Sequence, residues 1–375
     1  MRKVCFVVNP FAGLGGPLAR KGTDKHVIEM AVKKGLRLVA LDKAMRFLNR
    51  LRSLSLLGRL YFLTAHGKMG SEELEAISAS YTVVYKPRSW PTTALDTINT
   101  IRACLGHGAE LVVFVGGDGT ARDVMSVVKD EEVPILGVPA GVKMFSSLFA
   151  VSPERAAMAL LEWVEGKASP CRLEVVDYDE EAYRRGFLRL IFHGMVMGIC
   201  GAHVVGSSKQ VIGGDDVEEN RRAVARYFVE SMEECTLYVL GPGGTIKAIA
   251  DEIGIDKTLL GIDVVHNNKL IAKDVNEEEL YRLVKAHIER GGRVKIVVTP
   301  IGGQGFILGR GNQPISPRIL RLLGRNSIVV VADRYKLAGL KSLRVDTGDP
   351  EVDDMLRGYM RVIVDYGEEV VMRIE

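Results

Sequence analysis

The chain has 375 residues, with 50 Lys and Arg against 47 Asp and Glu, so its formal net charge is only +3. Such a charge excludes a strong electrostatic attraction to nucleic acid or to an anionic membrane surface. At about 150 residues per domain, the length predicts two domains and leaves a third open. Glycine is in excess, because it supplies 40 residues, about 11% of the chain against roughly 7% in an ordinary protein.

The cysteines and the apolar segments predict a cytoplasmic protein. Five cysteines are scattered along the chain, at positions 5, 104, 171, 200 and 235, with no Cys-x-x-Cys and no zinc-site spacing. We expect reduced, buried thiols of an intracellular protein. The apolar run at 4–8 is too short for a signal peptide, and the stretch at 187–200 is too short and too polar to cross a membrane.

Short β-branched runs alternate with helical patterns over residues 1–150, which we take as the first domain. Strands are expected at 4–8, 60–64, 81–85, 111–115 and 134–138, and helices at 26–34, 41–57, 71–79 and 93–105. Thr93 and Asp96 have the spacing of a capping box at the start of the last helix. Such alternation is typical of a parallel sheet with helices on both faces.

Strands become more frequent in residues 151–375, which we take as the second domain. They are expected at 172–178, 187–197, 202–205, 236–240, 258–265, 269–272, 294–298, 327–332, 344–346 and 360–364. Helices are expected at 246–253 and 276–290, and a polar loop at 213–220. The predicted fold class is α/β, with a Rossmann-like parallel-sheet domain followed by a strand-rich domain. It is left open that the last segment packs back on the first domain.

The glycines gather in four clusters, each directly after an expected strand: 9–16, 116–120, 241–245 and 299–305. Backbone N–H groups at the carboxyl end of a parallel strand face outward together, and glycine lets a phosphate approach them. One such turn is more often a tight connection, but four of them point to phosphate. The predicted phosphate or nucleotide ligands are Asn9, Gly13, Gly15, Gly16, Gly116, Gly117, Gly119, Thr120, Gly241, Gly243, Gly244 and Thr245.

The second cluster holds a carboxylate, Asp118, inside a turn that would otherwise attract anions. The turn is neither a Walker A loop nor a Gly-x-Gly-x-x-Gly fingerprint. A carboxylate beside phosphate is repulsive unless it holds a metal or takes a proton, and phosphoryl transfer to a hydroxyl needs both roles. Asp118 is therefore the predicted catalytic residue. Asp123 is interpreted as favouring the start of the following helix through its dipole.

Other polar residues and glycines near these turns are further candidates for phosphate or substrate binding. Lys143 could balance phosphate charge, and Arg310, between two glycines, could clamp a phosphate with two hydrogen bonds. For both, a structural or solvated role is about equally compatible with the sequence. The remaining candidates are Lys21, Asp24, Gly302 and Gly303.

The complete Gly-Gly-Asp-Gly-Thr at 116–120 and the Asn-Pro-x-Ala-Gly at 9–13 resemble the superfamily of NAD kinases, diacylglycerol kinases and phosphofructokinases. Within it, the chain is most similar to the ATP-NAD kinase-like, AcoX-like branch. The further segments that carry this resemblance lie at 21–24, 92–97, 137–144, 241–245 and 299–313. The resemblance thus runs over most of the chain.

The resemblance implies a kinase with its active site in the cleft between an α/β domain and a strand-rich domain. Asp118 would be the base toward an acceptor hydroxyl, for which the 2′-OH of the adenosine ribose of NAD is the first candidate. The glycines and Thr120 would hold the phosphates of ATP, with Mg²⁺ neutralising their charge. The family also implies a homo-oligomer that acts on a small molecule, without nucleic acid or membrane.

This sequence departs from NAD kinases in the segments that seat NAD. Its Asn276-Glu277 pair follows the third cluster and has the pattern of a helix start, and only Gly244 and Thr245 match the family's Thr-Gly-Ser run. Phosphoryl transfer is therefore better supported than NAD as the acceptor. A lipid or another polyol remains an alternative acceptor, another nucleotide or polyphosphate an alternative donor, and a nucleotide-sensing module without turnover an alternative function.

Overall fold

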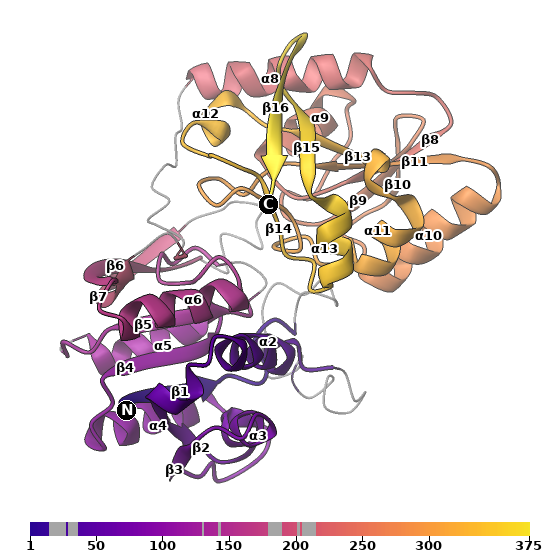
Figure 1. Cartoon of the computed structure of the whole chain (residues 1–375). Coiled ribbons are helices and arrows are strands. Elements are labelled where there is room, and N and C mark those ends of the chain that lie inside the picture. The colour runs from indigo at the N-terminus through magenta and orange to yellow at the C-terminus, as the bar shows by residue number, and fades with distance from the viewer. Residues whose placement is uncertain are drawn as a thin grey trace. The chain divides into compact units, whose positions relative to one another are not determined.

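The structure is a computed structural model that describes residues 1–14, 28, 37–129, 131–141, 144–178, 190–200, 203–204 and 215–375. The described residues fall into two compact units, 1–204 and 215–375. In Figure 1 the first unit runs from indigo to pink and the second from rose to yellow. The helix expected at 26–34 lies outside the described residues, apart from Ile28.

The first unit contains a seven-stranded sheet in the order β3-β2-β1-β4-β5-β7-β6. Its strands are β1 (Arg2–Val8), β2 (Leu60–Ala65), β3 (Tyr81–Tyr85), β4 (Leu111–Gly116), β5 (Ile135–Pro139), β6 (Ser169–Tyr178) and β7 (Leu190–Cys200). The first five are parallel, with β1 between β2 and β4. Strands β1 and β4 are buried along most of their length, as their β-branched runs predict. The expected Rossmann-like parallel sheet is confirmed.

Helices cover both faces of this sheet. They are α2 (Val39–Ser53), α3 (Ser71–Ala76), α4 (Ala94–Gly106), α5 (Asp118–Val128) and α6 (Pro153–Val164). Helix α2 packs against α6, and α4 packs against α5 (Figure 1). The capping box of α4 is confirmed, because the Asp96 carboxylate accepts hydrogen bonds from the Thr93 N–H and hydroxyl.

The first unit extends beyond the boundary expected at residue 150. Strands β6 and β7 form a long antiparallel pair, and β7 joins the edge of the sheet where Gly198 lies opposite Ile135 of β5. Both strands were expected in the second domain, because the pattern of the sequence changes before them. Pairing with β5, which no local pattern reveals, places them in the first unit.

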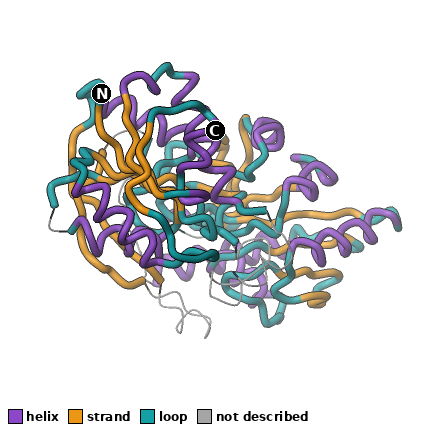
Figure 2. Tube along the Cα trace, turned by 90° about the horizontal axis from the view of Figure 1, so that it is seen from below, coloured by secondary structure: helices purple, strands orange, loops and turns teal. Residues whose placement is uncertain are grey.

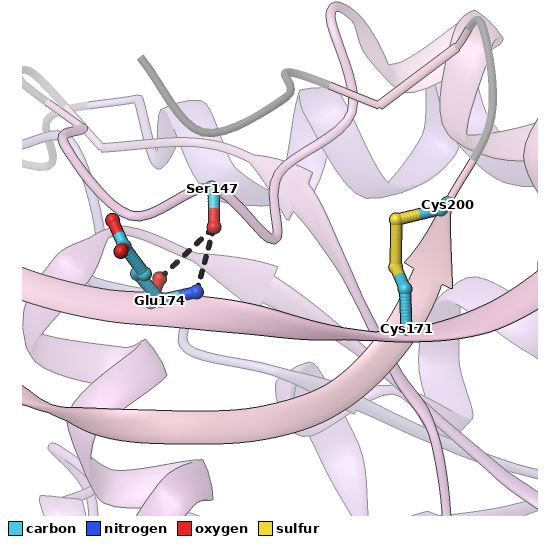
Figure 3. Close-up of a disulfide and its surroundings, with 4 residues drawn as sticks. All are labelled: Ser147, Cys171, Glu174 and Cys200. Atoms are coloured by element: carbon cyan, nitrogen blue, oxygen red, sulfur yellow. Dashed lines mark hydrogen bonds between the residues drawn. A yellow bond between two sulfur atoms is a disulfide. The ribbon is translucent and has the colours of Figure 1, made fainter. Parts of the chain in front are cut away.

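The prediction that all five cysteines are reduced, buried thiols is wrong. Cys171 and Cys200 form a disulfide between β6 and β7, with their Cα atoms 5.8 Å apart (Figure 3). Cys171 lies opposite Gly198, two residues before Cys200, so the two side chains are diagonal neighbours across the strand pair. Of the others, Cys5 and Cys104 are buried and Cys235 is exposed.

The second unit also contains a seven-stranded sheet, in the order β10-β9-β8-β11-β13-β15-β16. Its strands are β8 (Thr236–Leu240), β9 (Asp263–His266), β10 (Lys269–Ala272), β11 (Arg293–Val298), β13 (Ile328–Val331), β15 (Gly358–Asp365) and β16 (Glu368–Ile374). Two short strands, β12 (Phe306–Leu308) and β14 (Arg344–Val345), pair with each other in a separate sheet. Strands β8, β11, β13 and β15 are parallel, and the other neighbours are antiparallel. The strand-rich second domain is thus confirmed, and its last strands belong to its own sheet.

Two apolar cores lie on opposite faces of the second sheet. Alternate strand residues such as Tyr238 and Leu240 pack with α8 (Asp215–Glu230) and α9 (Gly244–Glu252). Their neighbours Leu237 and Val239 pack with α10 (Glu277–Glu289), α11 (Pro317–Leu323) and α13 (Pro350–Leu356). The short helix α12 (Arg334–Leu337) follows β13. Figure 2 distinguishes these helices in purple from the orange strands.

The loop expected at 213–220 is a helix from Asp215 onward. The first turns of α8 already carry packing residues, because Val217 is only 3% exposed and the buried Asn220 amide donates a hydrogen bond to the Val364 carbonyl (2.9 Å). The acidic residues around them gave this segment the composition of a loop, although the helix continues its packing face with Val224 and Phe228. Residues 213–214 lie outside the described residues.

Candidate functional site

Two of the predicted glycine turns meet at the carboxyl edge of the first sheet. The chain leaves β1 toward β2 on one side and later returns to β4 on the other, so β1 and β4 flank the point where the strand order reverses. Ligands of open α/β sheets bind at such points. Here the Asn9 amide donates a hydrogen bond to the Thr120 hydroxyl (2.9 Å), and the Asn9 N–H donates to the Val115 carbonyl.

Most glycines of these turns are required by packing. A Cβ on Gly116 would lie 2.5 Å from Cβ of Thr120, and one on Gly117 would lie 3.0 Å from Cα of Gly141. Gly13 has φ +82°, and a Cβ there would lie 2.2 Å from the Ala140 carbonyl oxygen. Gly119 is different, because a Cβ there would meet nothing within 4 Å. The packing of the described residues therefore does not explain why residue 119 is glycine.

Asp118 begins α5 and is only 4% exposed. One carboxylate oxygen accepts a hydrogen bond from the Phe145 N–H (2.6 Å), and the other accepts one from the Ser146 N–H (3.0 Å). A buried carboxylate needs such donors, because removing a charge from water is costly. Sequence reasoning predicted Asp118 but missed these two residues, since their function comes from the backbone and has no side-chain signature.

The segment that holds Asp118 is fixed to β6 by two serines. The Ser146 hydroxyl accepts a hydrogen bond from the Val176 N–H (3.0 Å) and donates one to the Val176 carbonyl (2.9 Å). The Ser147 hydroxyl contacts Glu174 in the same way, as Figure 3 shows. These contacts place the two N–H donors of the segment against the Asp118 carboxylate.

Burial raises the pKa of Asp118 to about 7, although the hydrogen bonds from Ser146 and Phe145 oppose the shift. The nearby carboxylate of Asp177, on β6, adds to the rise. Asp123 is half-buried, and burial together with Asp177 raises its pKa to about 6. Because α5 begins at Asp118, Asp123 lies beyond the first turn, and its interpretation as a residue of the helix start is wrong.

Asp177 thus lies near both Asp118 and Asp123 of α5, and the Arg122 guanidinium is 3.4 Å from the Asp177 carboxylate. No group of three or more His, Cys, Asp or Glu side chains within the described residues is arranged to hold a metal ion. Mg²⁺ is commonly held by one or two carboxylates together with substrate phosphates. The described side chains therefore form no metal site by themselves, and a metal ion here would need further oxygen ligands from a phosphorylated substrate.

The third predicted glycine turn lies at the carboxyl edge of the second sheet, where the strand order reverses between β8 and β11. Gly243 has φ +120°, and a Cβ there would lie 2.6 Å from the Thr299 methyl group. The Lys336 ammonium donates hydrogen bonds to the hydroxyls of Thr245 (2.9 Å) and Thr299 (3.0 Å). Sequence reasoning found Thr245 but missed Lys336.

The charges around Lys336 are arranged in a small network. Asp333 accepts hydrogen bonds from the Arg221 guanidinium (3.1 Å) and the Thr245 hydroxyl (3.2 Å), whereas the Lys336 ammonium contacts only neutral hydroxyls. Burial lowers the pKa of Lys336 to about 8. The sequence holds one indication that Lys336 could belong to a site, namely its position shortly after the buried strand β13.

The other predicted ligands have different surroundings. Gly302 and Gly303 are exposed in the turn after β11. Arg310 is only 4% exposed, lies over the Phe306 ring at 3.9 Å, and is 3.8 Å from the Asp346 carboxylate. The glycines beside Arg310 suggested an accessible clamp, but tertiary packing buries its side chain. The remaining candidates lie outside the described residues: Gly15, Gly16, Lys21, Asp24 and Lys143.

Comparison with protein families assigns both units. The model of the ATP-NAD kinase N-terminal domain matches residues 4–168, and that of the ATP-NAD kinase C-terminal domain matches residues 233–374. The chain belongs to the ATP-NAD kinase family. At the level of this family it is a phosphotransferase that acts on a hydroxyl group, with ATP or a related nucleotide as donor.

Two other comparisons contribute less. None of the curated proteins searched matches this ATP-NAD kinase family member. Among solved structures, UDP-GlcNAc 2-epimerase from Neisseria meningitidis, bound to UDP-GlcNAc, is similar with 10% identity and a TM-score of 0.22. The similarity covers 92% of this chain and 78% of the epimerase. No helix in the described part of the kinase chain is long and apolar enough to span a membrane.

The raised pKa of Asp118 predicts a pH dependence of stability. Because the folded-state pKa of about 7 exceeds the ordinary value of 3.8, the folded state binds the proton more tightly than the unfolded state does. This stabilisation is complete below the unfolded pKa and is lost as pH rises from about 4 to 7, by at most about 1.4 kcal/mol per pH unit. Denaturant unfolding of Asp118→Asn should give a shallower loss over this range than the wild type. The exposed Asp216→Asn is the control, and an Asp118→Asn slope equal to that of the wild type would contradict the assignment.

Proposed function

We propose that the protein is an ATP-dependent kinase that phosphorylates a small-molecule hydroxyl, with the ribose 2′-OH of NAD as the first candidate and Asp118 as the base. The observation that carries this proposal is a carboxylate, only 4% exposed, inside a glycine turn. Its pKa of about 7 matches the proton affinity that a general base needs near neutral pH. The match to ATP-NAD kinase models over both units supports the same class of reaction.

The turn around Asp118 also has the features of a phosphate site. Gly117 precedes α5, an 11-residue helix whose first N–H groups lie at the carboxyl edge of the sheet. Gly119, whose missing side chain no packing in the described residues explains, leaves room for a phosphate to approach the backbone. Thr120, whose hydroxyl already accepts a hydrogen bond from Asn9, could donate its own proton to a phosphate oxygen.

In the proposed reaction an Asp118 carboxylate oxygen accepts the proton of the acceptor hydroxyl. The freed oxygen forms a bond to the γ-phosphorus of ATP, while the bond from that phosphorus to the bridging oxygen breaks and ADP leaves with the electron pair. The Phe145 and Ser146 N–H groups orient the carboxylate, and their hydrogen bonds favour its ionised form. Mg²⁺ would neutralise the phosphates, and Asp123 and Asp177 are the protein groups proposed to hold it.

The second unit is proposed to contribute an anion site at the turn 241–245. The Lys336 ammonium and the N-terminus of the nine-residue helix α9 lie at this turn. The ammonium donates hydrogen bonds only to the two threonine hydroxyls, and the nearby Asp333 carboxylate opposes the lowering of its pKa, so a phosphate would add a directly hydrogen-bonded anion. The glycines at 241, 243 and 244 are proposed to let the phosphate reach the backbone.

Asp118→Asn preserves the shape of the side chain and removes the base. We expect kcat for phosphoryl transfer to fall by about 10²- to 10⁴-fold, with the folded state retained. A coupled assay of ADP release together with chromatography of the phosphorylated product measures the loss. Asp96→Asn is an unsuitable control because it breaks the cap of α4, so the exposed Asp216→Asn serves instead. Full activity in Asp118→Asn would refute the base assignment.

Lys336→Met keeps the length of the side chain and removes its charge. We expect it to weaken binding of inorganic tripolyphosphate by about 10-fold or more, because hydrogen bonds to charged groups contribute roughly 1.5–3 kcal/mol. Isothermal titration calorimetry measures the affinity. Lys285→Met is the matched control, since that side chain is 53% exposed and lies on α10. Equal affinities of the two variants would argue against an anion site at Lys336.

A further inference from the structure

The loop between β3 and α4 presents an exposed aromatic ring beside the catalytic edge of the first sheet. The Trp90 residue is 44% exposed, and its ring centroid lies 4.9 Å from that of Phe11, a residue that is only 2% exposed. Phe11 belongs to the turn after β1, the same turn from which Asn9 contacts Thr120. The indole is therefore fixed to the turn that meets the Asp118 turn, while much of its surface faces solvent.

One cationic side chain lies over this indole, and two more precede it in the same loop. The Lys68 ammonium, on the connection after β2, lies 5.4 Å from the Trp90 ring centroid. Lys86 and Arg88 precede Trp90 in the same loop, and all three cations are exposed. None of the ion pairs formed within the described residues includes Lys68, Lys86 or Arg88, although the Lys68 charge opposes the burial that raises the pKa of Glu73.

This combination matches the chemistry of a nucleotide. A planar heteroaromatic base binds by stacking on an aromatic side chain, and its phosphates require cations close by. Open α/β sheets bind nucleotides outside the carboxyl ends of their strands. The exposed Trp90 ring lies at this edge of the first sheet.

We propose that Trp90 is the stacking platform for the base of a bound nucleotide, with Lys68, Lys86 and Arg88 balancing the charge of its phosphates. This inference rests on the proposed function, because the nucleotide would be the donor or the acceptor of the phosphoryl group. The base is adenine or nicotinamide, and both rings are planar and stack in the same way. The binding platform lies on the turn next to Asp118, so it positions a substrate without taking part in proton transfer.

The two tryptophans of the chain allow a direct test of this platform. Trp163 lies on α6, with the Arg2 guanidinium 5.2 Å from its ring, and Arg2 is the first residue of β1, at the opposite edge of the sheet. In Trp163→Phe the emission therefore comes from Trp90 alone, and in Trp90→Phe it comes from Trp163 alone. Titration of each variant with AMP and with nicotinamide mononucleotide identifies the base, and inorganic tripolyphosphate controls for phosphate binding.

We expect AMP or nicotinamide mononucleotide to quench the emission of Trp163→Phe in a saturable way and to leave that of Trp90→Phe unchanged. Tripolyphosphate should not quench either variant. Trp90→Ala should bind the quenching nucleotide about 10- to 100-fold more weakly, whereas Trp90→Phe should retain most of the affinity because it keeps an aromatic face. The fluorescence arm leaves residue 90 unchanged, so it stays informative even if Trp90→Ala fails to fold.

The outcomes separate this inference from the proposed function. Phosphoryl transfer by the wild type without any nucleotide effect on Trp90 emission would overturn the stacking platform and leave the kinase assignment intact. Equal quenching of Trp90 and Trp163 would also overturn it. Saturable quenching of Trp90 alone, without phosphoryl transfer to any acceptor, would support the platform and refute the kinase.

Discussion

A carboxylate that is removed from water must be given hydrogen-bond donors, and the first unit is organised around one such group. Asp118 obtains its donors from the backbone N–H groups of Phe145 and Ser146. This arrangement requires the end of β4 and the segment after β5 to lie side by side, which the parallel pairing of these strands provides. The same parallel edge brings Asn9 to Thr120. The turn, the proposed base and its oriented donors are thus consequences of one sheet topology.

The β6–β7 pair extends this constraint. Ser146 and Ser147 fix the donor segment to β6, and β6 also carries Asp177, whose charge raises the pKa of both Asp118 and Asp123. The disulfide between Cys171 and Cys200 links β6 to its partner strand further along the same hairpin. The hydrogen bonds to the Asp118 carboxylate within the described residues come from Phe145 and Ser146, not from a side chain of this hairpin. The hairpin therefore acts on the site through the position of the backbone and through charge.

Local patterns in the sequence predicted the features that are themselves local. The strands before the glycine turns, the capping box of α4 and the place of Asp118 in a turn before a helix all follow from residues adjacent in the chain. Features made by distant residues were missed. Lys336 reaches Thr245 across 91 positions, and the disulfide joins strands 29 positions apart. The sequence left a phosphate-binding and a structural role of Arg310 equally open, because its neighbouring glycines give no information about the Phe306 ring and Asp346 that surround it.

The most direct test of the central claim is an acceptor screen with ATP labelled at the γ-phosphate, in which NAD, NADH and small polyols are incubated with the wild-type protein and Mg²⁺. Because we propose Asp118 as the base toward an acceptor hydroxyl, we predict that label passes to an acceptor, with NAD labelled at its 2′ position first. Release of label only as inorganic phosphate, or no release at all with every acceptor, would contradict the account.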